Sequence, residues 1–151
     1  MTETTTSGEK YDGFTAEERE AMKERAKELK TAARRPARSK KVDGLTDLLE
    51  KIAEMPAEDR AIAERVHAVI MASGPDLEPR TWYGQPAYAK DGQVVCFFQS
   101  ASKFKTRYST LGFNEAAKLD DGPMWPTAFA LLDVTPAVEK QIAALVEKAL
   151  G

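Results

Sequence analysis

Cysteine and histidine are nearly absent from this sequence, which has one of each among its 151 residues. A single cysteine excludes an intramolecular disulfide and fits a reducing compartment, so we expect a cytoplasmic protein. His67 has no cysteine or second histidine near it in the sequence, so no metal site is expected there. Cys96 lies in an apolar run, where a thiol behaves as a small hydrophobic group, and we expect no catalytic role for it.

Long apolar runs and phosphate-binding loops are also missing. No apolar run approaches the ~20 residues that a membrane-spanning helix needs, and the first 14 residues lack the apolar core of a secretory signal. The sequence contains no glycine-rich phosphate loop and no serine in a nucleophile elbow. We therefore expect no membrane association, no cofactor and no catalytic residues.

Charge is unevenly distributed along a chain whose net charge is only −2. Residues 30–41 carry six basic residues and no acidic one, between two segments that are acidic overall. Pro36 interrupts any helix there, so we interpret residues 36–42 as a solvated basic linker. The alternative is an interaction module whose linker attracts nucleic acid or an acidic protein. The overall pI of about 5.6 counts against nucleic acid.

Two segments precede the linker. Residues 1–12 are polar and rich in threonine, which predicts a disordered tail. Residues 13–35 predict a helical arm that begins with a capping box. The apolar stripe of this helix is narrow, so we expect it to touch the body only through Met22, Leu29 and neighbouring alanines. Such an arm would serve as a lid or as a dimer contact.

Residues 43–151 predict one α+β domain. Two amphipathic helices come first, and Thr135 with Pro136 is a start signal for a C-terminal helix. Asp91 and Gly92 form a two-residue hairpin-turn signal. The predicted strands are residues 85–90, 93–100, 105–113 and 124–133. We expect a four-stranded antiparallel meander sheet, packed by the two preceding helices and the C-terminal helix.

The predicted strands carry apolar residues on both faces. In the second strand, Val94, Cys96 and Phe98 alternate with Val95 and Phe97, whereas a sheet with one wet face would alternate apolar and polar residues. Something is therefore expected to cover the second face. The candidates are the arm, a second subunit in a homodimer, or a bound apolar ligand.

One stretch resembles a known family: TWYGQPAYAKDGQVVCFFQSASKFKTRYSTLGF. Trp82 precedes Gly84, Pro86 and Tyr88 in a Gly-x-Pro-x-aromatic motif, and a hairpin turn, an apolar strand and a basic, aromatic strand follow. This order is similar to that of the YdhG-like domains of unknown function, over residues 45–150. The arm resembles an extension that many actinobacterial members carry. The resemblance implies a small sheet with terminal helices packed on it, and iron binding as an alternative function, because some members are described as frataxin-like iron chaperones.

Basic and aromatic residues together form the candidate ligand site. Lys103, Lys105 and Arg107 are two residues apart, so on a strand they would share one face, beside the aromatic residues of the hairpin. The predicted ligand-binding residues are Trp82, Tyr83, Gln85, Tyr88, Lys103, Lys105 and Arg107. Ligand sites are typically apolar hollows with a few placed polar groups. The leading hypothesis is a non-catalytic binding domain for a small, partly apolar anion.

Overall fold

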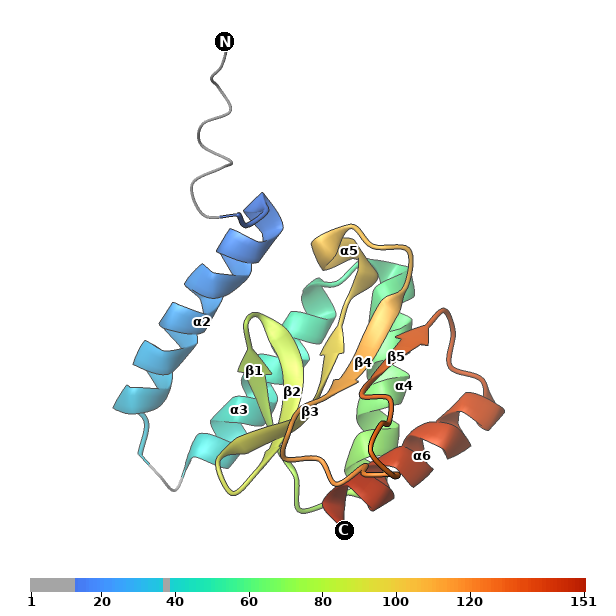
Figure 1. Ribbon diagram of the computed structural model, residues 1–151. Helices are drawn as coiled ribbons and strands as arrows, with labels where there is room; N and C mark the ends of the chain where they lie inside the picture. Colours follow the sequence, from blue (N-terminus) through green and yellow to red (C-terminus); the bar gives the residue numbers. More distant parts are fainter. Residues whose placement is uncertain (1–12, 37–38) are drawn as a thin grey trace.

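The computed structural model describes residues 13–36 and 39–151 and has an α+β architecture (Figure 1). The helices are α2 (Ala16–Arg34), α3 (Lys40–Glu54), α4 (Ala57–Ser73), α5 (Ala101–Phe104) and α6 (Pro136–Leu150). The strands are β1 (Glu78–Trp82), β2 (Gln85–Lys90), β3 (Gln93–Gln99), β4 (Ser109–Phe113) and β5 (Ala128–Leu131). All neighbouring strands are antiparallel, in the order β1-β2-β3-β4-β5. The predicted antiparallel meander is confirmed, whereas the predicted tail falls outside the described residues.

The sheet has five strands in the described part of the chain, one more than the sequence predicts. The additional strand is β1, which pairs with β2 from Glu78 opposite Ala89 to Trp82 opposite Gln85. Its sequence, EPRTW, contains a proline and two charged residues and therefore lacks a strand pattern. Proline is nevertheless tolerated in an edge strand, where one side of the backbone has no partner strand. Gly44 allows α3 to approach this strand closely, because a side chain there would collide with the carbonyl of Pro79.

The predicted strand 105–113 is wrong in its first half. Residues 101–104 form the short helix α5, Lys105 ends it with a left-handed φ of 56°, and β4 begins only at Ser109. Lys103, Lys105 and Arg107 therefore do not share a strand face. The predicted strand 124–133 also shortens, to Ala128–Leu131.

The main core lies between the sheet and the helices α3, α4 and α6. The fully buried residues of this core include Leu48, Ile52, Val66, Ile70, Tyr88, Cys96, Phe98, Leu111, Ile142 and Val146. Val95 joins the same core next to Cys96, because the register between β2 and β3 shifts at a bulge after Tyr88. The apolar pattern of Val95 and Cys96 thus reflects a bulge within one core, and not two separately covered faces.

The opposite face of the sheet is covered in part by its own aromatic residues. The Phe97 ring packs over Gly112, where a side chain would collide with the ring in its present position. It also lies against Trp82, with 5.2 Å between ring centroids. Farther along this face, Ala128 and Ala130 of β5 are exposed. The backbone of α2 lies mainly against β1 and α5, which places the arm at the edge of the sheet (Figure 1).

The arm begins as the sequence predicts. The Thr15 hydroxyl accepts from the Glu18 amide, and the Glu18 carboxylate accepts from the Thr15 amide. The prediction that it touches the body only through Met22, Leu29 and alanines is wrong. Met22 is 38% exposed and Leu29 is 53% exposed. The buried residue of the helix is Ala21.

Acidic side chains make the principal contacts of the arm. Glu24 bridges Lys51 of α3 and Lys103 of α5, at nitrogen-to-oxygen distances of 2.9 and 2.5 Å. The carboxylate of Glu28 accepts from the amides of Tyr83 and Gly84, at 2.9 and 2.8 Å. Both residues of this turn have left-handed φ values, 55° and 75°, so their successive amides form a small anion-binding concavity. The arm is therefore held chiefly by charge and hydrogen bonds.

Glu24 links the docking of the arm to pH. Partial burial raises the pKa of Glu24, but hydrogen bonds and charge attraction from Lys103 and Lys51 lower it more, so its pKa lies below the usual 4.5. Because the pKa is depressed in the docked state, the contribution of this carboxylate to docking is complete above pH 4.5. That contribution is lost as the pH falls through the docked-state pKa.

We expect the arm to loosen in acid. Between about pH 6 and about pH 3.5, amide hydrogen exchange in residues 16–34, corrected for the intrinsic rate, should accelerate relative to exchange in α6. Glu24→Gln should exchange faster already at the upper pH. Glu20→Gln makes the same charge change at an exposed arm position and should behave like the wild type. Arm exchange that is independent of pH would contradict this account of docking.

Candidate functional site

The seven predicted ligand-binding residues separate into four environments. Tyr88 is 1% exposed and its hydroxyl lies 2.8 Å from Nδ1 of His67. Burial raises the pKa of this phenol and lowers the pKa of His67. Tyr88 is therefore part of the core and does not form a pocket wall.

Trp82 and Tyr83 lie where the arm meets the sheet edge. Their rings pack edge to face, with centroids 4.9 Å apart. The guanidinium of Arg25, on the arm, lies 5.8 Å from the centroid of the Tyr83 ring. Both aromatic residues are half-buried and support the docking of the arm.

Gln85 and Lys103 line a pocket of about 300 Å³ beneath the arm, which we call the arm pocket. Its walls also include Glu24, Lys51, Met55 and Phe98. The arm pocket thus combines residues of α2, α3, β2, β3 and α5. The structure places two of the seven predicted residues here, and Arg107 does not line this pocket.

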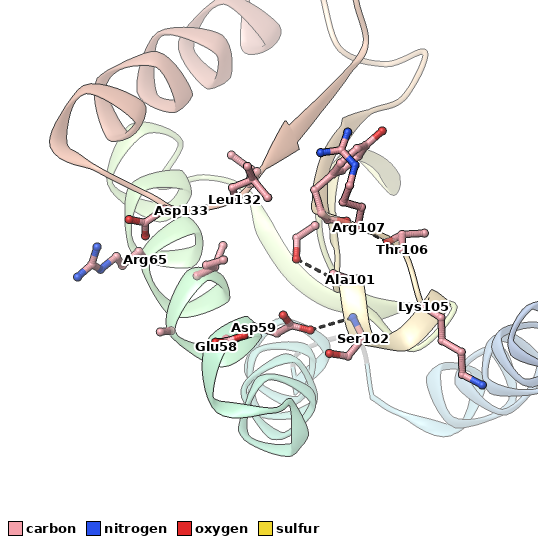
Figure 2. Close-up of a pocket in the computed structure, with 15 residues that line it drawn as sticks. Glu58, Asp59, Arg65, Ala101, Ser102, Lys105, Thr106, Arg107, Leu132 and Asp133 are labelled. Atoms are coloured by element: carbon pink, nitrogen blue, oxygen red, sulfur yellow. Dashed lines mark hydrogen bonds between the residues drawn. The ribbon is translucent and has the colours of Figure 1, made fainter.

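Lys105 and Arg107 border a larger hollow, the outer cleft, of about 680 Å³ (Figure 2). It lies between the first turns of α4, the connection from α5 to β4, and the end of β5. Figure 2 shows Arg107 on the wall opposite Arg65 and Asp133, and Lys105 extended away toward α2. Lys105 is 77% exposed at its side chain and pairs with Glu17 of the arm at 2.8 Å.

Two charged residues of the outer cleft have structural partners. The Asp59 carboxylate accepts from the Ser100 hydroxyl at 2.5 Å and from the Ser102 amide at 3.0 Å. Burial raises the pKa of Asp59, but these serine hydrogen bonds lower it more, so the carboxylate is ionised at neutral pH. Arg65 donates to the carbonyl of Val134 at 2.7 Å. These contacts fix the position of both side chains in the wall of the cleft.

Arg107 is an exposed cation of the outer cleft. Within residues 13–36 and 39–151, no carboxylate lies within ion-pairing distance of its guanidinium, which lies 5.2 Å from the centroid of the Tyr108 ring. Two large apolar residues of the cleft are exposed beside it, Tyr108 at 36% and Leu132 at 72%. A cation thus adjoins exposed apolar surface in one hollow.

Sequence reasoning missed most of the outer cleft. Asp59 has the pattern of an acidic residue in the first turn of a helix, which the helix dipole explains without a cleft. Nothing in the sequence marks Leu132 as a cleft residue, because its exposure depends on β5 ending at Leu131. The sequence analysis named Arg107 as a candidate from its alternation with aromatic residues, but for a strand geometry that the structure does not have.

The single cysteine and the single histidine both have structural environments. Cys96 is buried in β3, and burial raises the pKa of its thiol to about 12. His67 is hydrogen-bonded to a core tyrosine. Among the described residues, no group of three or more histidine, cysteine or acidic side chains is placed to hold a metal ion. No helix in this part of the chain is long and apolar enough to cross a membrane.

Comparison with known proteins does not assign the chain to a family: no family model, no curated protein and no solved structure matches it. The resemblance to YdhG-like domains therefore remains a prediction from the motif.

Cys96 should be inert in the folded protein. At about pH 8 a thiol with so high a pKa is almost entirely protonated, and the thiolate is the nucleophile. We expect iodoacetamide to leave the native protein unmodified, as measured by mass spectrometry, and to alkylate it fully in denaturant. Rapid labelling of the native protein would show that β3 opens or that the thiol is activated.

Proposed function

We propose that this protein is a non-catalytic binding domain and that its outer cleft takes a small, partly apolar anion. The observation that carries the proposal is the exposed guanidinium of Arg107, which has no acidic partner among residues 13–36 and 39–151, in the same cleft as the exposed side chains of Tyr108 and Leu132. Arginine presents a planar fork of donors that matches a carboxylate or a phosphate. The adjacent apolar surface would be removed from water by the rest of the ligand.

The charge distribution of the cleft favours one orientation of such a ligand. Glu58 and Asp133, both exposed, line other parts of the hollow. Their negative charges repel an anion, so the anionic group of the ligand is directed to Arg107. The apolar part then lies against Tyr108 and Leu132. This proposed site includes Lys105 and Arg107, two of the ligand-binding residues predicted from the sequence. Lys105 lies at the rim of the cleft and forms an ion pair with Glu17.

Benzoate and benzamide test the proposal, because they have nearly the same shape and differ in charge. We expect benzoate to shift the amide resonances of residues 106–109 and 131–133, and benzamide to bind more weakly. Arg107→Gln should weaken benzoate binding by about tenfold, since it removes a charge-assisted hydrogen bond. Added salt should weaken wild-type binding.

Arg80→Gln is the matched control. It makes the same charge change on β1, where Arg80 pairs with Glu78 at 3.6 Å and does not line the outer cleft. Benzoate affinity should be unchanged in this variant. Equal affinities of the wild type and Arg107→Gln, or resonance shifts confined to other parts of the protein, would refute the proposed site.

A further inference from the structure

Gln85, which lines the arm pocket, carries a buried acceptor that has no hydrogen-bond partner among the described residues. Gln85 is 5% exposed, and among the described residues its Oε1 is the buried side-chain polar atom without a hydrogen-bond partner. A buried polar group left unpaired costs about 1–3 kcal/mol, so proteins rarely retain one without a reason. Gln85 is also one of the residues that line the pocket.

The hydrogen bond made by the amide nitrogen of Gln85 fixes the orientation of this amide. Nε2 of Gln85 donates to the carbonyl of Trp82 at 3.5 Å. Exchanging the oxygen and nitrogen of the amide would bring two carbonyl oxygens together, with no donor between them. The unpartnered atom is therefore the oxygen, and what it lacks is a donor.

The charged groups of the arm pocket are already paired with one another. Lys51 binds Glu24 at 2.9 Å and Glu54 at 3.6 Å, and Lys103 binds Glu24 at 2.5 Å. Two acidic and two basic residues line the pocket, so their formal charges cancel. The Ser100 hydroxyl, which also lines the pocket, donates to Asp59. Because the pocket has no net charge, its electrostatics do not favour a charged ligand.

The remaining walls of the pocket are apolar. Met55 and Pro56 come from the end of α3, and Pro86 and Phe98 come from β2 and β3. A pocket of about 300 Å³ is at the small end of the range for ligand sites. The size of the pocket, its lack of net charge and the unpaired acceptor on Gln85 together define a narrow class of ligand.

We propose that the arm pocket is a second binding site, distinct from the outer cleft, for a small neutral molecule that donates a hydrogen bond to Oε1 of Gln85 once the Gln85 side chain turns toward the pocket. The donor is a hydroxyl or an amide N–H, and the rest of the ligand is a compact apolar group that packs against Met55, Pro86 and Phe98. Glu24 lines one side of the pocket, so the docked arm forms part of its wall.

Phenol and toluene test this proposal, because they have nearly the same shape and only phenol donates a hydrogen bond. Toluene is the more apolar molecule, so a pocket that selected only for burial would prefer it. In the wild type we expect phenol to bind more tightly, with shifts in the Gln85 side-chain amide and in the backbone amides of Gly84 and Lys103. These resonances also separate the arm pocket from the outer cleft, where residues 106–109 would respond.

Gln85→Met supplies the matched variant. It keeps the approximate length of the side chain and removes the acceptor, so the ratio of phenol affinity to toluene affinity should fall by about tenfold. The melting temperature should be unchanged or raised, because the substitution removes a buried atom without a partner.

The wild-type comparison stands by itself if Gln85→Met does not fold. Toluene binding as tightly as phenol in the wild type would overturn the proposal, as would the same affinity ratio in both proteins. The absence of any shift in the arm-pocket resonances at millimolar phenol would also overturn it, since a bound water would then be sufficient to satisfy Gln85.

Discussion

The Asp59 carboxylate holds together the parts of the molecule on which both hollows depend. It lies in the first turn of α4 and accepts hydrogen bonds from the Ser100 hydroxyl and the Ser102 amide, where β3 leads into α5. This contact sets the position of α5 against α4. Lys103 on α5 then reaches Glu24 of the arm, and the chain after α5 forms one wall of the outer cleft. A helix of four residues has little stability of its own, so its placement must come from such contacts.

The outer cleft and the arm pocket share Ser102 as a lining residue, yet they differ in which of their polar groups have no partner. In the outer cleft Arg107 has no acidic partner within the described part of the chain, and exposed apolar side chains line the same cleft. In the arm pocket the charges are paired, and the unmet group is a neutral acceptor on Gln85. Since a ligand is recognised by the groups that the protein leaves unsatisfied, these hollows call for different chemistry.

The arm shows how a helix with a narrow apolar stripe can still dock. Ala21 is its buried apolar contact, while Glu24 and Glu28 bind two lysines and two turn amides. Each carboxylate has both oxygens engaged, and hydrogen bonds to a charged group are stronger than those between neutral groups. Exposed ion pairs usually contribute little, but Glu24 and its lysines are partly buried, where charges are less screened.

Local signals in the sequence predicted the elements that depend on neighbouring residues. Asp91-Gly92 predicted the hairpin of β2 and β3, Thr15 with Glu18 predicted the start of α2, and Thr135 with Pro136 predicted the start of α6. The strand β1, the helix α5 and the arm contacts could not be predicted in this way. Asp59 and Ser100 are 41 positions apart, and Glu28 and Tyr83 are 55 apart, so no local pattern records their contact. The sequence by itself determined the hairpin and the helix starts, whereas the tertiary structure decided which charges are paired and which polar atoms remain unsatisfied, because those properties depend on distant parts of the chain meeting.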